Sequence, residues 1–275
     1  MIDAHQHFWA LGRGDYAWPN ADVQPIFRDF MPEDLLPHLE AAGVAQTILV
    51  QANDKVAETE FLLSLAAKYQ WIAGVVGWVD LGSAQALGEI DRLAQDPKLK
   101  GLRPMLQSIE QTDWIMADAQ QPALAHMAQK GLRFDALIQP RHLPQIAALA
   151  WRHPQLAIVI DHAAKPKMGA GQGPDAEWRA GMAQLAQRPN ICCKLSGLVT
   201  EIGPHWQIED LQPFTRHLLD SFGPSRLIWG SDWPVLNLAS DYASWKSCTD
   251  ALLQDLNPQE RAMIFGENAR RFYGI

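Results

Sequence analysis

Two histidines near the start of the chain, His5 and His7, are of a type and spacing that could do acid–base or metal-ligand chemistry. They lie in IDAHQHFW, residues 2–9, which otherwise has the apolar character of a buried strand. Side chains alternate along a strand, so the two histidines share one face. Imidazole titrates near neutral pH and is a common metal ligand. Burying two imidazoles requires polar partners, so the pair indicates a functional site more strongly than a packed core.

Three further polar side chains lie in or at the end of other strand-like segments. His162 and Asp232 each end one such segment, and Lys194 lies inside a third. Alternation puts the apolar Cys193 and Leu195 on one face of that third segment and Lys194 on the other. An inward lysine costs several kcal/mol unless it is paired or deprotonated. Lys194 therefore also belongs to the candidate site.

The elements that must position these residues follow from hydrophobic periodicity. Strands are expected at about 2–7, 46–52, 72–79, 100–105, 133–138, 156–162, 190–197 and 226–232. Helices are expected at about 32–43, 56–69, 84–95, 121–130, 144–152, 176–187, 210–222, 240–255 and 258–272. This alternation predicts a (β/α)8 TIM-type barrel, regular or distorted, as one domain over residues 1–275. An open doubly wound sheet would usually carry a GxGxxG turn after its first strand, and the sequence has none there.

Alternation within such a barrel divides each strand into an inward and a helix-facing set. The helix-facing set of the first strand is expected to be Ile2, Ala4 and Phe8. The inward set of the sixth strand is expected to be Leu156, Ile158, Ile160 and His162. Barrel active sites lie at the C-terminal ends of the strands. The polar residues expected to converge at that end are His5, His7, His162, Lys194 and Asp232.

Composition limits the partners. The net charge of -8 argues against nucleic acid or an anionic membrane as the main partner. The three cysteines, Cys192, Cys193 and Cys248, do not form a disulfide framework by number or spacing. The chain opens without a secretory signal pattern, and no apolar run approaches the roughly 20 residues that span a bilayer. We expect a cytoplasmic protein that acts on a small molecule.

Four motifs in order resemble the amidohydrolase superfamily. They are IDAHQHFW, DHAAKP at 161–166, CKLSGL at 193–198 and GSDWPV at 230–235. The resemblance covers nearly the whole chain. Within the superfamily, the motifs most resemble the amidohydrolase-related branch that hydrolyses sugar lactones, of the fuconolactonase and rhamnonolactonase type. This resemblance implies a hydrolase that acts on a carboxylic ester, opening a sugar lactone to the sugar acid.

The resemblance also implies roles for the candidate residues. Asp232 is expected to act as general base on the attacking water, with a pKa near the working pH. The carbonyl oxygen is expected to be held by His5, His7 or His162, with Lys194 as a cationic helper.

Departures from the family pattern affect how many metal ions the site is expected to hold. Two-metal members carry a bridging lysine or glutamate on the fourth strand and a histidine at the end of the fifth. Here the fourth strand offers Arg103, and the fifth reads FDALIQ without histidine. No bridged binuclear centre is therefore expected. One divalent ion, with zinc as the best match, could be held by His5, His7, His162 and Asp232. The same four residues could also act with no metal, and the sequence leaves both possibilities open.

Substrate contacts are expected at the neighbouring strand ends, from Gln51, Trp78 and Arg103, and from Glu201 after the seventh strand. The long loop 8–31 is expected to cover the site with Trp9 and Trp18. Only Arg103 is a clear inward arginine, with Arg141 a weaker candidate, which favours a neutral sugar lactone over a dicarboxylate one. The alternatives are a metal-dependent decarboxylase or other hydrolase of the superfamily and, more remotely, a non-catalytic barrel that binds a sugar acid. The oligomeric state is not predicted.

Overall fold

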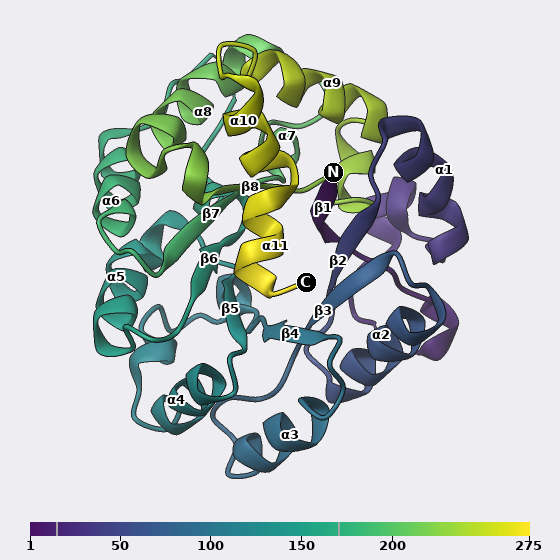
Figure 1. The fold of residues 1–275 in the computed structure, drawn as a ribbon, viewed down its shortest axis with the longest axis vertical. Coiled ribbons are helices and arrows are strands. Elements are labelled where there is room, and N and C mark those ends of the chain that lie inside the picture. The colour runs from purple at the N-terminus through teal and green to yellow at the C-terminus, as the bar shows by residue number, and fades with distance from the viewer. Residues whose placement is uncertain (15, 170) are drawn as a thin grey trace.

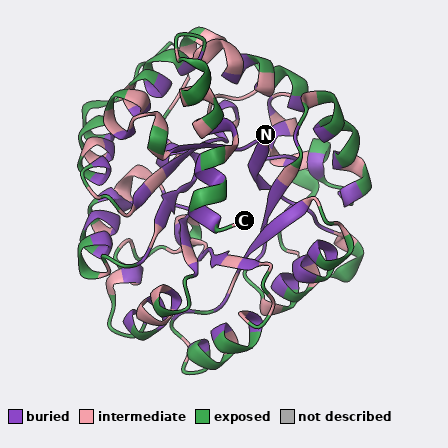
Figure 2. Ribbon diagram, in the orientation of Figure 1, coloured by how far each residue is buried: buried purple, intermediate pink, exposed green. Residues whose placement is uncertain are grey.

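A computed structural model of the protein describes residues 1–14, 16–169 and 171–275. Eight parallel strands pair in chain order, and helices surround them, which confirms the (β/α)8 barrel (Figure 1). The strands are β1 (Ile2–Gln6), β2 (Gln46–Val50), β3 (Ile72–Gly77), β4 (Leu99–Leu102), β5 (Arg133–Ala136), β6 (Ile158–Ile160), β7 (Ile191–Leu195) and β8 (Leu227–Trp229). The main outer helices are α1 (Pro32–Ala42), α2 (Val56–Lys68), α3 (Ala86–Leu93), α4 (Gln121–Gln129), α5 (Leu143–Arg152), α6 (Ala176–Ala186), α8 (Ile208–Phe222) and α9 (Tyr242–Leu252). Figure 2 shows the strands buried and the helices exposed on their outer faces.

The barrel closes between β8 and β1 through residues that follow β8. The backbone N–H of Asp232 donates to the carbonyl of His5 at 2.8 Å, and that of His7 donates to the carbonyl of Trp233 at 2.7 Å. These segments carry three of the predicted site residues. The seam of the barrel and the candidate site are therefore built from the same backbone.

An apolar cluster fills the barrel interior below the site. Its members come from the strands and from the C-terminal helix α11 (Asn268–Tyr273): Ile2, Ala4, Ile48, Val50, Val76, Val159, Ile228, Ala269, Phe272 and Tyr273. Figure 1 shows α11 crossing the middle of the barrel, beside the start of β1. This helix plugs the end of the barrel at which the strands begin.

The expected facing of β1 is wrong for Ile2 and Ala4, which belong to the interior cluster. The cause is a β-bulge. Asp3 pairs with Thr47 and Gln6 pairs with Leu49, so two residues of β1 lie opposite a single residue of β2. The bulge lets Ala4 and His5 both face inward. His5 therefore faces inward as predicted, but it does so because of the bulge and not because of strict alternation.

The expected inward set of β6 is wrong for its three aliphatic residues. Leu156, Ile158 and Ile160 pack in the cluster between the strands and the outer helices, whereas Val159 faces the interior. Alternation from Val159 makes Asp161 the next inward residue of the segment.

Some element boundaries differ from the sequence expectation. The last helix is divided into α10 (Pro258–Ala262), a π-helical turn (Met263–Glu267) and α11, and a short α7 (Leu198–Ile202) was not expected. The loop after β1 contains two 3-10 segments, Leu11–Arg13 and Ala21–Ile26. None of the helices in the described ranges combines the length and apolarity that crossing a membrane requires.

Candidate active site

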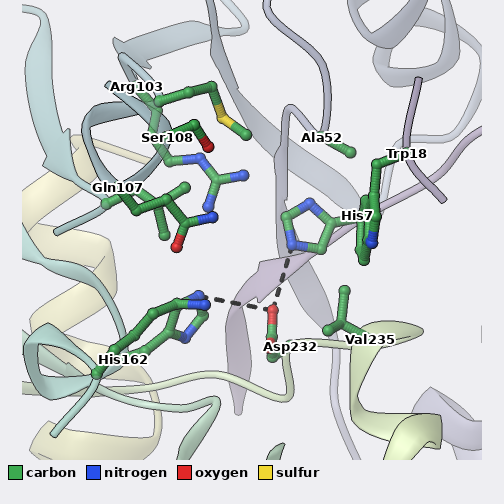
Figure 3. Close-up of a pocket in the computed structure, with 12 residues that line it drawn as sticks. His7, Trp18, Ala52, Arg103, Gln107, Ser108, His162, Asp232 and Val235 are labelled. Carbon is green, nitrogen blue, oxygen red and sulfur yellow. Dashed lines mark hydrogen bonds and ion pairs between the residues drawn. The ribbon is translucent and has the colours of Figure 1, made fainter. Parts of the chain in front are cut away.

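Three imidazoles converge on one carboxylate oxygen at the C-terminal end of the barrel. Asp232 Oδ1 lies 3.3 Å from His7 Nε2 and 3.7 Å from both His5 Nε2 and His162 Nε2. Figure 3 shows His7 and His162 on two sides of Asp232. All four side chains are buried. The structure thus brings together the four residues that sequence reasoning proposed as metal ligands.

The tautomer of His7 follows from its second ring nitrogen. Nδ1 lies 2.8 Å from the carbonyl oxygen of Val50, which can only accept, so Nδ1 carries the proton. Burial lowers the pKa of His7, so the ring is neutral near pH 7 and Nε2 carries a lone pair. This lone pair faces the ionised Asp232 across 3.3 Å. Two electron-rich atoms at that distance are stabilised by a cation or proton between them, which suits a metal-ligand pair.

His162 reaches the site through an unusual backbone. Residues 162–165 all have left-handed φ values, from +48° to +62°. A non-glycine residue pays about 1–2 kcal/mol for this conformation. The turn sends His162 into the mouth even though Asp161, its neighbour, also faces inward. The ring is held by Ser196 Oγ, 3.0 Å from Nδ1, and lies against Gly197, where a Cβ would come within 2.3 Å of Nδ1.

A buried charge cluster lies behind His5. Lys194 Nζ donates a hydrogen bond to Asp135 Oδ2 at 2.6 Å and lies 3.0 Å from both Asp161 Oδ1 and His5 Nδ1. Asp161 Oδ2 also accepts from Arg103 Nη1 at 3.3 Å. Lys194 is inward as predicted, but it is fully buried and does not line the cavity. Asp135 and Asp161 were not predicted as site residues. The signal that could have found them was the inward lysine itself, which needed acidic partners.

Burial and these contacts set the protonation states. Burial lowers the pKa of His5 well below its ordinary value and that of His162 to about 4. Burial alone would raise the pKa of Asp232, but its close contacts with His162, His7 and His5 outweigh burial and lower the pKa below the ordinary range. The expectation that Asp232 titrates near the working pH is therefore not met. At neutral pH the site is an ionised carboxylate among neutral imidazoles.

A cavity of about 310 Å³ opens above Asp232. Its wall consists of His7, Trp18, Ala52, Arg103, Met105, Gln107, Ser108, Leu137, His162, Lys165, Asp232 and Val235. Figure 3 shows Trp18 beside His7 on one side and Gln107, Ser108 and Arg103 on the other. The cavity therefore combines an aromatic wall, a polar wall and the Asp232 carboxylate.

Of the four residues predicted to bind substrate, only Arg103 lines the cavity. Gln51 lies behind it, donating to the Arg103 carbonyl at 2.8 Å and accepting from Nη2 at 3.2 Å. Trp78 and Glu201 do not line the cavity, and Glu201 forms an ion pair with Lys165 at 3.4 Å.

Cavity residues on the connecting turns were mostly missed. Trp18 lines the wall as expected, while Trp9 packs edge-to-face against it with ring centroids 5.7 Å apart. Gln107, Ser108 and Lys165 were not predicted. Gln107 and Ser108 lie in a three-residue 3-10 segment (Leu106–Ser108) and Lys165 lies in the left-handed turn, and neither segment is long enough to show a period of two or of 3.6.

Comparisons with known proteins identify the family of the chain. The sequence model described as amidohydrolase matches residues 2–275. An L-fucono-1,5-lactonase from Burkholderia ambifaria is 48% identical over 100% of this chain and 95% of the relative. An L-fucono-1,5-lactonase from Burkholderia multivorans is 37% identical over 100% of this chain and 96% of the relative. A crystal structure of an amidohydrolase from Burkholderia multivorans with bound zinc superposes with a TM-score of 0.92 at 36% identity, covering 100% of this chain and 99% of that one. The chain therefore belongs to the amidohydrolase family.

Proposed function

We propose that this protein hydrolyses a sugar lactone to the open-chain sugar acid, and that L-fucono-1,5-lactone is its substrate. The observation that carries the proposal is the convergence of three imidazoles on Asp232 beneath a cavity of about 310 Å³. That volume lies at the small end of ligand pockets and fits a single sugar ring. The whole-length similarity to two L-fucono-1,5-lactonases supports both the reaction and the choice of sugar.

The side chains divide the steps of ester hydrolysis. Water attacks the lactone carbonyl carbon, and Asp232 accepts the proton that the water loses. As the bond from the carbonyl carbon to the ring oxygen breaks, the same proton passes to that oxygen, leaving a hydroxyl and a carboxylic acid. Negative charge develops on the carbonyl oxygen, and the guanidinium of Arg103, which lines the cavity, is placed to stabilise it. Lys194 acts from behind, by holding His5.

One divalent ion, with zinc as first choice, fits the donor set of His5, His7, His162 and Asp232. The lone pair of neutral His7 that faces Asp232 supports this assignment. A bound ion supplies a Lewis acid and a water whose pKa is lowered toward ~7. The nearby carboxylates already have cationic partners, which argues against a second, bridged ion: Asp135 is paired with Lys194. Asp161, which lies with His5 and His162 in a second possible ligand group, is paired with Lys194 and Arg103.

The test is acid release from a panel of aldonolactones (L-fucono, L-rhamnono, D-galactono and D-arabinono), by wild type and by Asp232→Asn. We expect turnover by the wild type to fall by about 10²- to 10⁴-fold in the variant, the usual contribution of a positioned acid–base group. Chelation that abolishes activity, with recovery on adding zinc, would support the ion. Full activity in metal-free protein would assign the chemistry to the side chains alone. Release of carbon dioxide from an aromatic acid, with no lactone hydrolysed, would overturn the proposal.

A further inference from the structure

The cavity wall opposite His7 is formed by the turn that follows β4. Its residues Gln107 and Ser108 line the cavity with polar side chains (Figure 3). Within residues 1–14, 16–169 and 171–275, neither the Gln107 amide nor the Ser108 hydroxyl forms a hydrogen bond; only the backbone of these residues does. The amide offers two donors and one acceptor, and the hydroxyl offers one donor and an acceptor.

Most of the other polar groups around the cavity already have protein partners. Arg103 bonds to Gln51 and Asp161. Lys165 is paired with Glu201. The imidazoles of the site are held by their second ring nitrogens. Among the described residues, Gln107 and Ser108 line the cavity with side chains that offer both donors and acceptors and have no protein partner, whereas the Nε1–H of Trp18, also without a partner, offers a single donor. A polyhydroxylated ring supplies matching donors and acceptors.

The turn is fixed from the neighbouring βα connection by Arg141. Each of the five N–H groups of its guanidinium donates one hydrogen bond. The acceptors are Gln139 Oε1 at 3.1 Å, Thr112 Oγ1 at 2.7 Å and the carbonyl oxygens of Glu110 at 3.1 Å, Ile109 at 2.8 Å and Gln107 at 3.4 Å. Arg141 therefore has no donor left for a substrate carboxylate. Its geometry is that of a clamp on the segment that presents Gln107 and Ser108.

We propose that Gln107 and Ser108 recognise the hydroxyl pattern of the sugar lactone and that Arg141 is a positioning residue that acts through them. The inference rests on the proposed lactone hydrolysis and names the residues that select its substrate. The opposite wall carries Trp18 and Val235, which present apolar surface to the C–H face of a sugar ring. A polar wall facing an apolar one orients a ring that has hydroxyls on one edge. Fixing the polar wall beforehand reduces the ordering cost of binding.

The test compares Gln107→Ala, Ser108→Ala and Arg141→Lys on two kinds of lactone. The first kind is a set of epimeric aldonolactones, and the second is δ-valerolactone, which has the ring ester but no hydroxyl. Gln107→Ala is expected to lower kcat/KM for its best aldonolactone by about tenfold, mainly through KM, and for δ-valerolactone by less than about twofold. The ratio of kcat/KM between epimers is expected to change. Ser108→Ala should act in the same direction by about threefold.

Arg141→Lys keeps the positive charge but loses the planar fork of five donors. It is expected to reproduce the selectivity change of Gln107→Ala and to retain hydrolysis of δ-valerolactone. Gln111→Ala is the matched control, because Gln111 belongs to the same segment but is exposed and outside the cavity wall. Urea unfolding of each variant separates a selectivity change from loss of folded protein.

Two results would overturn the inference: an unchanged ratio between epimers, or equal losses on aldonolactones and δ-valerolactone. A failure of the proposed function would look different, because the wild type itself would then release acid from no lactone. In that case the inference falls together with the function on which it rests.

Discussion

Gly197→Ala tests whether catalysis depends on the position that the structure gives to His162. Gly197 has φ +63°, and an added Cβ would lie 2.3 Å from Nδ1 and 2.6 Å from Cγ of the His162 ring. The ring would have to retreat by about 1 Å to reach ordinary contact, and a misplacement of that size costs about 10²-fold in rate. The left-handed backbone adds about 1–2 kcal/mol for a non-glycine residue, and the hydrogen bond to Ser196 is worth about 1 kcal/mol. We expect kcat/KM to fall about 100-fold and the free energy of unfolding to fall by about 2–3 kcal/mol.

The matched control is Gly43→Ala. Gly43 ends α1 with φ +68° and has no atom within 4 Å of its added Cβ, so it carries the backbone cost without a clash. Gly43→Ala should lose about 1–2 kcal/mol in urea unfolding and keep the wild-type kcat/KM for the lactone. The reasoning is refuted if Gly197→Ala also keeps wild-type kcat/KM, since the placement of His162 would then not matter for the reaction.

Two further substitutions test the buried charges. Lys194→Met removes the cation shared by Asp135 and Asp161. Breaking such a buried pair is expected to lower the free energy of unfolding by about 3–5 kcal/mol. A loss under about 1 kcal/mol in urea unfolding would contradict the existence of the charge cluster. Glu58→Gln tests a carboxyl whose pKa burial raises to about 7, against 4.5 for its ordinary value. Because the folded state then binds the proton more tightly, Glu58 costs the protein stability as pH rises from about 4.5 through 7, by up to about 3 kcal/mol. The free energy of unfolding of the variant, relative to that of the wild type, should therefore increase between about pH 5 and pH 8. A difference in unfolding free energy that does not vary with pH would show the assignment to be wrong.

Regular strand alternation predicted part of the site. It placed Lys194 correctly, because this residue follows the pleat of β7. It also placed His7 and Asp232 correctly, although both lie beyond the ends of their strands and Asp232 has φ +61°. It failed for Ala4 and for the aliphatic residues of β6, because the bulge in β1 and the left-handed turn after β6 are local departures from the pleat. The turn sequence HAAK contains no glycine, so nothing in its composition marks positive φ.

The residues missed altogether have two physical causes. Asp161 was missed because assigning His162 to the inward face excluded its neighbour under strict alternation. Gln107 and Ser108 were missed because their 3-10 segment has three residues, too few to show a period. The segment is also held by Arg141, which is more than 30 residues away in sequence. Partners distant in sequence are not visible to a pattern read along one chain.

Both departures from the pleat solve the same geometric problem. In a regular strand two successive side chains cannot face the same side. At β1 the bulge turns Ala4 and His5 inward together, and after β6 the left-handed turn brings Asp161 and His162 inward together. The left-handed turn has four residues, so its conformational cost is about 4–8 kcal/mol, which the surrounding contacts must offset. Two of these contacts are the hydrogen bond between His162 and Ser196 and the ion pair at Lys165. Such strain is retained where function requires it. Here it lets one strand supply both the carboxylate that pairs with Lys194 and the imidazole that faces Asp232, which a regular strand of any sequence could not do.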